Sequence, residues 1–535
     1  MAKGKSKKQS PPTTKSDGAM AAKGVEDGGE EKEMVILQSD DGMEFVVSVL
    51  EASQSKTIRS MIWRSGGNHI FLFDGDETKC TPIPLSVKGD ILSKVVEYCK
   101  KHASGDDPSW DAKFVDDLDH ETLCDLILAA DRLRNQGLLN LTCQTVAKMI
   151  KGKSSHEICK IFNIRSYVTR AKKKLGEVEN VKTVYWQLGT RFTPAPTNDG
   201  EELKPNLDKD LALTKEHDAL MALHVVRCQE FTGYDPKRRG FICTRFCNYN
   251  IAFFDLDKES RLARGPPIAT ITGPISEWGV QSSVNVISLK VTESEVGYNF
   301  SVFGTVLARD QVDYRCLYLF KREEEDAQLI TSSDDTLTLT DPSRVLILSD
   351  EIYFEIDLKI KCDGGAIKDF SKGVTSFSRS RLPADKQTMT VSLYSWLSRV
   401  QLSCENVVNP VEATIAINIL KGPCNLSRVS AWTVGNYRDR IILYGSEGGS
   451  TQTVTCYGGD SVPLSRCVVA VPVDKNLVLL LHSGAEMLEV TLGQSDEHCI
   501  CKMGRGELQV KVAWTGILKR KKYDFDHVGA VRLLH

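Results

Sequence analysis

The sequence predicts a protein in two parts: a small α/β domain that ends in additional helices, followed by a mostly-β domain that is a sandwich or a barrel. Three observations indicate this fold class. Residues 34–166 combine two short strand-like segments with the apolar periodicity of helices. Residues 167–230 are charged and punctuated by Pro and Gly, as expected of a linker. Over residues 231–518 the apolar period changes from about 3.6 residues to about 2.

In the N-terminal domain, turn and cap residues mark where the elements begin and end. "MVILQS" and "MEFVVS" predict two strands joined at Gly42, and residues 49–62 predict a helix. "KGDILSKVVEYCKKH" and "DHETLCDLILAADRL" have helical spacing, and Asp119 is suited to cap the second. Ser154 and Glu157 form a capping-box pattern that starts a last short helix.

The helix expected over residues 138–151 has more apolar surface than a single core requires. At about 100° per residue, its apolar residues form two stripes about 110° apart. The first stripe is Leu139, Cys143, Val146 and Ile150, and the second is Leu138, Leu141, Thr142, Thr145 and Met149. One interpretation is a helix buried between two layers of its own domain. Because the helix ends a small domain, an outward groove for a partner helix is the other.

The remaining segments are a linker, strands and two polar ends. Within residues 167–230, "LALTKEHDALMALHVVRC" has a helical pattern. "YFEIDLKIKC", "EATIAINIL" and "LQVKVAWT" alternate as half-buried strands do. Residues 1–33 predict a disordered arm and residues 519–535 a basic tail. The lysines of the arm are compatible with nuclear import, although a solubilising tail is the commoner reason for such runs.

The composition excludes several classes of function. The chain has 535 residues, a formal net charge of −3 and 41% hydrophobic residues, which are ordinary values for a globular protein. This charge gives no reason to expect nucleic acid or a membrane as a partner. No apolar run reaches the about 18 residues of a membrane-spanning helix, and the first 33 residues hold no signal-like apolar stretch. We expect an intracellular protein, in nucleus and cytoplasm, whose 16 cysteines are free thiols.

No residue pattern predicts a catalytic or metal site. Gly152-Lys153-Ser154 resembles the end of a phosphate-binding loop, but Ala147 stands where that motif needs Gly. Cys243 and Cys247, like the cysteines of "HCIC", have no partner pair at zinc spacing. We therefore expect no cofactor, no metal ion and no enzymatic activity.

Several stretches of the N-terminal domain carry a family resemblance. They include "VILQSDDGMEF", "ILSKVVEYCKKH", "LCDLILAADRL" and the long "GLLNLTCQTVAKMIKGKSSHEICKIFNI". With them, residues 34–165 resemble the plant form of the Skp-type adaptors of SCF (Skp–cullin–F-box) ubiquitin ligases. The resemblance implies a BTB/POZ fold with C-terminal helices and no catalysis. It also implies a bridge between a cullin and an F-box protein that selects substrates for ubiquitination.

The family's F-box contacts carry over by motif onto one face of the chain. They fall on Leu139, Cys143, Val146, Ala147, Ile150, Ile158 and Phe162. The resemblance thus implies that the first stripe faces an F-box partner and that the second stripe belongs to the core.

The chain departs from the family at two places. "RSYVTRAKKKLGEVEN" follows "FNI" where members usually have an acidic helix and a "WAFE"-like tail that completes the F-box clasp. Asp131 and Arg132 replace the Asn-Tyr pair that faces the cullin in plant members. The first hypothesis is an adaptor that docks F-box proteins for degradation. The alternative is a Skp-like protein that no longer binds cullin and sequesters F-box or F-box-like partners.

A second resemblance covers the β-rich part. "SVNVISLKV", "GTVLARDQVDYRCLYLFKR", "IYFEIDLKIK", "VEATIAINIL" and "MGRGELQVKVAW" occur between about residues 280 and 515. They resemble a plant domain of unknown function that is abundant in grasses. The resemblance implies a β-rich fold and no known chemistry.

Overall fold

A computed structural model describes most of the chain. The described residues are 33–64, 69–72, 81–164, 207–248, 256–261, 264–340, 342–361, 365–382, 387–437, 439–445 and 454–519. The expected arm, most of the linker and the basic tail beyond residue 519 lie outside them. The contacts divide the chain into two units, one of Met1–Asp107 with Arg132–Gln136 and one of Pro108–Asp131 with Gly137–His535.

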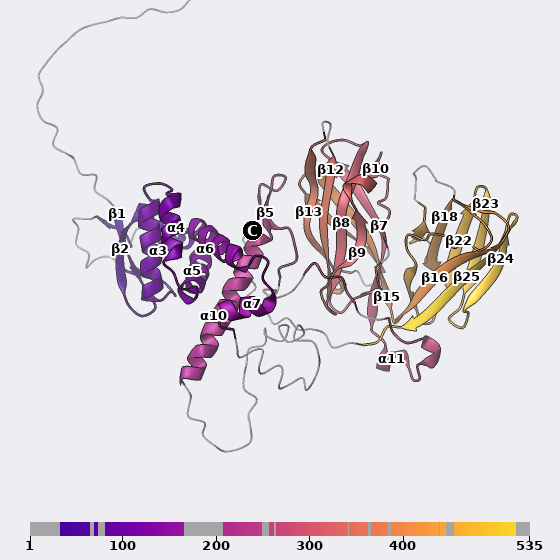
Figure 1. The fold of residues 1–535 in the computed structure, drawn as a ribbon, viewed down its shortest axis with the longest axis horizontal. Coiled ribbons are helices and arrows are strands. Elements are labelled where there is room, and N and C mark those ends of the chain that lie inside the picture. The colour runs from indigo at the N-terminus through magenta and orange to yellow at the C-terminus, as the bar shows by residue number, and fades with distance from the viewer. Residues whose placement is uncertain are drawn as a thin grey trace, which may run out of the picture. The chain divides into compact units, whose positions relative to one another are not determined.

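The first unit is a small sheet accompanied by helices (Figure 1). Its sheet has the order β2-β1-β3, and β4 pairs with β1 in parallel. The strands are β1 Glu33–Gln38, β2 Glu44–Ser48, β3 Phe71–Leu72 and β4 Ile83–Pro84, and the helices are α1 Val49–Ala52, α2 Lys56–Arg64 and α3 Gly89–His102. Gly42 has a φ of 84° in the β1–β2 turn, which is where the sequence predicts it.

One helix expected in this unit is divided into two. Residues 49–62 predict a single helix, but the chain leaves helical geometry after Ala52. The Ser55 hydroxyl accepts a hydrogen bond from the Ile58 amide and donates one to the Leu133 carbonyl. This buried hydroxyl caps α2, and a fresh cap defines a new helix.

The second unit begins with the helices α4 Pro108–Asp116, α5 His120–Leu133, α6 Gln136–Ile150, α7 Ser155–Ile161 and α10 Leu207–Glu230. The sequence predicts the caps of two of them, α5 and α7, correctly. The Asp119 carboxylate accepts from the Thr122 amide at 2.8 Å. Ser154 and Glu157 form the predicted capping box at the start of α7. A short hairpin of β5 Thr232–Asp235 and β6 Gly240–Cys243 follows α10.

The β-rich part contains two sandwiches with separate cores. In the first, the sheet β10-β8-β12-β13 faces the sheet β11-β7-β15-β14, and β9 pairs with β8. Its strands are β7 Ser282–Ser294, β8 Phe300–Asp310, β9 Leu317–Arg322, β10 Gln328–Ile330, β11 Leu346–Ile347, β12 Glu351–Lys361, β13 Ile367–Ser378, β14 Thr388–Ser395 and β15 Ser398–Val408. The alternate residues of "YFEIDLKIKC" from Phe354 to Ile360 are buried in this core.

The second sandwich has the sheets β21-β16-β25-β24 and β19-β18-β22-β23 around a core of its own. Its strands are β16 Pro410–Lys421, β18 Arg428–Thr433, β19 Ile441–Tyr444, β21 Val468–Pro472, β22 Leu477–Ser483, β23 Glu486–Leu492, β24 His498–Met503 and β25 Gly506–Gly516, with β17 Cys424–Leu426 and β20 Val454–Cys456 paired beside them. Among the described strands no sheet closes on itself, so the predicted β fold is a sandwich and not a barrel. The chain leaves β15 for β16 at Asn409, whose φ of 48° makes the sharp turn.

Candidate docking surface

The four residues of the first α6 stripe are all buried. Leu139 is 6% exposed, Cys143 3%, Val146 1% and Ile150 5%. In the second stripe Leu138 and Thr142 are fully buried, whereas Leu141, Thr145 and Met149 are half-buried. The family resemblance implies that this stripe faces an F-box partner, and in the folded chain the stripe is covered. The interpretation of a helix between two layers describes α6 better.

The short helix α7 packs against the beginning of α5. The rings of Phe162 and His120 lie 5.7 Å apart, and His120 Nδ1 lies 3.1 Å from the Ile161 carbonyl. Ile158 and Phe162 are both buried, and Ala147 is half-buried. The structure therefore gathers the predicted F-box contacts on the helices α6 and α7, although it contains no partner to test that role.

Helix α10 lies along α5 and reaches α6 (Figure 1). Lys215 Nζ is 2.6 Å from Glu121 Oε1, near the start of α5. Gln229, near the end of α10, donates from Nε2 to Asn140 Oδ1 on α6 at 2.8 Å. Helices α5 and α10 therefore run in the same direction, and α10 ends beside the first turns of α6.

Two buried thiols show how close α10 comes to its neighbours. Burial raises the pKa of Cys143 to about 12, with further contributions from the carboxylates of Asp131 and of Glu230 on α10. The pKa of Cys124 on α5 is likewise raised to about 12, mainly by burial and also by acidic groups that include Asp218 of α10. Cys143 is one of the predicted F-box contacts, so the charge at the end of α10 acts on a thiol of the predicted docking stripe.

A buried histidine lies in this contact. His224 of α10 is 1% exposed, and burial lowers its pKa to about 4, although the charge of Asp131 on α5 opposes that shift. The Cys228 sulfur lies 3.5 Å from its Nε2. At neutral pH the imidazole is therefore uncharged within the helix contact.

The two residues predicted at a cullin interface have different surroundings. Asp131 is half-buried on α5, and its charge acts on His224 and Cys143. Arg132 is exposed and donates from Nη1 to the Ser86 carbonyl at 3.0 Å. Asp131 thus belongs to the α10 contact, a role that the sequence does not indicate because α10 is distant along the chain.

The far end of α10 enters a cluster that includes residues of the first sandwich. We call this cluster the aromatic cluster; it consists of Cys228, Phe246, Cys247, Leu256, Tyr314 and Tyr353, with Phe231, Cys243 and Val374 packed against it. Beside it, the buried Arg309 guanidinium donates to Glu355 at 2.8 and 2.9 Å. Glu355 also accepts from the Phe246 amide at 2.7 Å. Burial alone would raise the pKa of Glu355, but Arg309 holds that pKa below its usual value.

The cysteine clusters noted in the sequence do not assemble a metal site in the described part of the chain. The sulfurs of Cys243 and Cys247 lie 3.4 Å apart, and Cys499 and Cys501 occupy alternate positions of β24. No group of three or more His, Cys, Asp or Glu among the described residues is arranged to hold a metal ion. All described cysteines are free.

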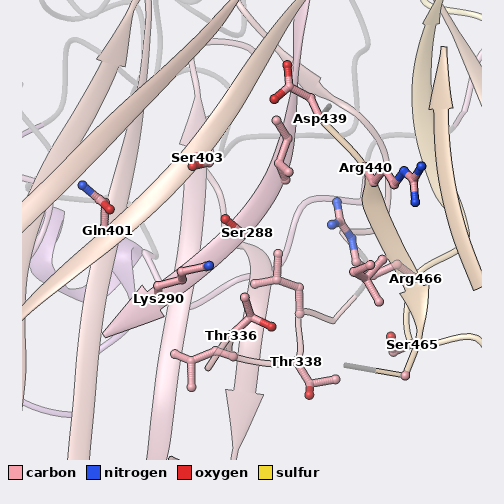
Figure 2. A pocket seen from close by; sticks show the side chains of 15 residues that line it. Ser288, Lys290, Thr336, Thr338, Gln401, Ser403, Asp439, Arg440, Ser465 and Arg466 are labelled. Atoms are coloured by element: carbon pink, nitrogen blue, oxygen red, sulfur yellow. The ribbon is translucent and has the colours of Figure 1, made fainter. Parts of the chain in front are cut away.

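A polar cavity lies at β7 and β15 of the first sandwich and β19 of the second (Figure 2). Its volume is about 300 Å³. Lys290, Arg440 and Arg466 line it together with one carboxylate, that of Asp439, which accepts from the Thr388 hydroxyl. Hydroxyl groups complete the wall, from Ser288, Thr336, Thr338, Ser403 and Ser465. This lining favours polar or anionic molecules over apolar ones.

The small sheet, the helices that follow it and the α6–α7 pair define the class of the N-terminal part, and the comparisons with known proteins agree. Residues 33–104 match the Skp1 family tetramerisation domain, and residues 136–171 match the Skp1 family dimerisation domain. SKP1-like protein 1 of Oryza sativa subsp. japonica is 43% identical over 176 residues, which cover 28% of this chain and 91% of that protein. SKP1-like protein 11 of Arabidopsis thaliana is 41% identical over 156 residues, covering 28% of this chain and 94% of that protein.

The chain therefore belongs to the Skp1 family through its N-terminal part. Residues 283–512 match a domain of unknown function, DUF6598, which spans both sandwiches. Both resemblances noted in the sequence are thus confirmed. A solved structure of human GIVD cytosolic phospholipase A2 aligns with 44% of this chain and 33% of its own, at 8% identity and a TM-score of 0.15, which is too low to indicate a shared fold. None of the helices in the described residues is both long and apolar enough to cross a membrane.

Proposed function

We propose that this chain is a non-catalytic adaptor of SCF-type ubiquitin ligases that docks F-box proteins for ubiquitin-dependent protein degradation. The observation that carries the proposal is the match of both Skp1 family domains, joined to relatives of which this chain covers more than nine tenths. The predicted contacts Leu139, Cys143, Val146 and Ile150 share one face of α6, as a surface that receives a partner helix requires.

The DUF6598 part adds two sandwiches and a polar cavity to this adaptor. We propose that the DUF6598 part is an additional recruiting or regulatory surface and that it does not itself contact the F-box protein. On the sequence of the arm we also propose a distribution over nucleus and cytoplasm, which imaging of a tagged full chain would test.

Capture of F-box segments by the full chain tests the proposal directly. We expect a panel of plant F-box segments to be retained, and Ile150→Asp to abolish retention because it places a charge within the α6 stripe. Lys148→Asp is the matched control, since it introduces the same charge on the exposed side of α6. Capture of no segment, or equal capture by Ile150→Asp, would contradict the proposal.

Cullin co-purification separates the proposal from the alternative of a Skp-like protein that sequesters F-box partners outside the ligase. The relatives do not favour that alternative. We expect stoichiometric cullin with the full chain, whereas F-box capture without cullin would support sequestration.

A further inference from the structure

Helix α10 occupies the side of α6 that the adaptor function needs. Viewed down α6, Asn140, Cys143 and Ala147 lie on adjoining positions within about 60° of one another. Gln229 bonds to Asn140, and the Glu230 carboxylate acts on the Cys143 thiol. Two of the seven predicted F-box contacts, Cys143 and Ala147, thus lie on the side of α6 that α10 meets.

The C-terminal half of α10 is buried all round. Its buried side chains are Ala219, Leu220, Ala222, Leu223, His224, Val225, Val226 and Cys228. These positions are distributed over the full turn of the helix, so no single neighbour covers them all. On one side are α5 and α6, reached through Glu121 and Asn140. On another is the aromatic cluster, which holds Cys228 and the adjoining Phe231.

We propose that α10 is a built-in competitor for the F-box site: it lies against the side of α6 that carries Asn140, Cys143 and Ala147, and an F-box helix binds only when α10 leaves. The proposal rests on the proposed function, because it needs the α6 stripe to be the F-box site. It goes beyond that function, because it makes docking conditional on a segment of the same chain. The covering segment lies directly before the DUF6598 part, so that part holds one end of the competitor.

Two features of the contact fit a helix that covers the stripe reversibly. The ion pair between α10 and α5 lies at the surface: Lys215 and Glu121 are 49% and 54% exposed. An exposed ion pair of this kind contributes little to holding α10 in place. The aromatic cluster retains Cys228 and Phe231 through buried contacts, so a released α10 stays attached to the first sandwich and can return.

Such competition lowers the apparent affinity for an F-box segment by the fraction of chains in which α10 has left the stripe. We call the state in which α10 lies against α6 the covered state. A substitution that weakens the covered state therefore strengthens F-box binding. A substitution that merely damages the docking surface does the opposite. The direction of the change distinguishes the two roles.

The test is the dissociation constant of one plant F-box segment for the full chain, measured by calorimetry for Leu223→Asp and wild type. Leu223 is buried in the C-terminal half of α10, and a buried charge there disfavours the packed state of the helix. We expect the dissociation constant to fall at least about tenfold. His217→Asp is the matched control: it puts the same side chain on an exposed position of α10 and is expected to leave the constant unchanged.

A milder pair of variants keeps the test decisive if Leu223→Asp does not fold. Lys215→Glu faces Glu121 with a like charge, and we expect a dissociation constant about two- to fivefold lower than that of wild type. Exchanging both charges, as Glu121→Lys with Lys215→Glu, restores the pair and the wild-type value.

The outcomes separate this inference from the proposed function. Tighter binding by Leu223→Asp or Lys215→Glu supports the competitor. Wild-type affinity in both variants, or weaker binding, overturns it and leaves the adaptor function standing. Absence of binding in every variant, wild type included, overturns the adaptor function and the competitor together.

Discussion

Two charge pairs in the neighbourhood of α10 differ in how deeply they are buried. On the side of the aromatic cluster, Arg309 is fully buried and paired with a Glu355 that is also buried. On the side of α5, Lys215 and Glu121 meet with about half of each side chain exposed. Breaking a buried pair leaves an uncompensated charge and costs about 3–5 kcal/mol, whereas an exposed pair is worth about 0–1 kcal/mol. The comparison teaches that the charge pair beside the aromatic cluster resists disruption far more strongly than the pair that joins α10 to α5.

The largest effect is expected on the sandwich side. Glu355→Ala leaves the Arg309 guanidinium buried without its partner, and we expect the free energy of unfolding of the first sandwich to fall by about 3–5 kcal/mol in urea denaturation. Glu324→Ala breaks the surface pair with Lys361 and is the control, expected to cost at most about 1 kcal/mol. Equal costs for the two variants would remove the expected difference between a buried and an exposed charge pair.

Next in size is the apolar contact on the helix side. Leu223→Ala deletes a buried side chain, a change that costs about 2–5 kcal/mol in a packed core. Because α10 opens locally, we expect the loss to appear as faster amide hydrogen exchange in α10, with exchange in the β16 and β25 strands unchanged. Met221→Ala, at a half-buried position of the same helix, is the control with a smaller effect. Faster exchange throughout both sandwiches would show that α10 is no independent element.

Acidification is expected to release the same contact. The pKa of His224 lies at about 4 in the covered state, below the ordinary histidine value of 6.5, so the released helix binds more protons between these values. The covered state is therefore at full stability above pH 6.5 and loses stability as the pH falls toward 4. At pH 5 we expect α10 to open up to about 20-fold more often than at pH 7, in exchange rates corrected for intrinsic chemistry.

Two histidine variants check the origin of that pH dependence. His224→Gln is expected to abolish it, since glutamine does not titrate. His217→Gln, at an exposed position of the same helix, is expected to retain it. A pH dependence that survives in His224→Gln would assign it to other groups.

The smallest effect concerns the bond between α10 and α6. Gln229→Ala and Asn140→Ala each remove one partner of a hydrogen bond 2.8 Å long, and we expect each to destabilise the covered state by about 0.5–1.5 kcal/mol. In a double-mutant cycle the two effects should not add, because the second variant has no bond left to lose. Full additivity would show that the bond contributes nothing.

Local chemistry predicts a large share of this fold. Asp119, Ser154 and Glu157 are found in the capping roles that their positions indicate, and the alternation in β12 gives its buried face correctly. The division of the β part into two sandwiches was not predicted, because alternation shows which face of a strand is buried and not which sheet it joins. The turn at Asn409 separates the two cores, and a single Asn carries too little signal to reveal it.

The candidate docking surface could be predicted only in part, because local patterns do not show which distant segments meet. The excess apolar surface of α6 indicates either a second layer or a partner groove, and in the folded chain that surface is buried. The periodicity contains nothing about which segment lies beside α6, and it does not predict the contact of α10 at Asn140. Gln229 and Asn140 are 89 residues apart, and no local pattern connects them.

Hydrogen exchange of the full chain with and without an F-box segment tests the central claim most directly. The account predicts that amides of α6 and α7 gain protection on binding, while amides of α10 lose it and those of both sandwiches do not change. If α6 and α7 gained protection while the amides of α10 kept theirs, the competitor proposal would be contradicted. If neither α6 nor α7 changed at a saturating concentration of the segment, F-box docking itself would be contradicted.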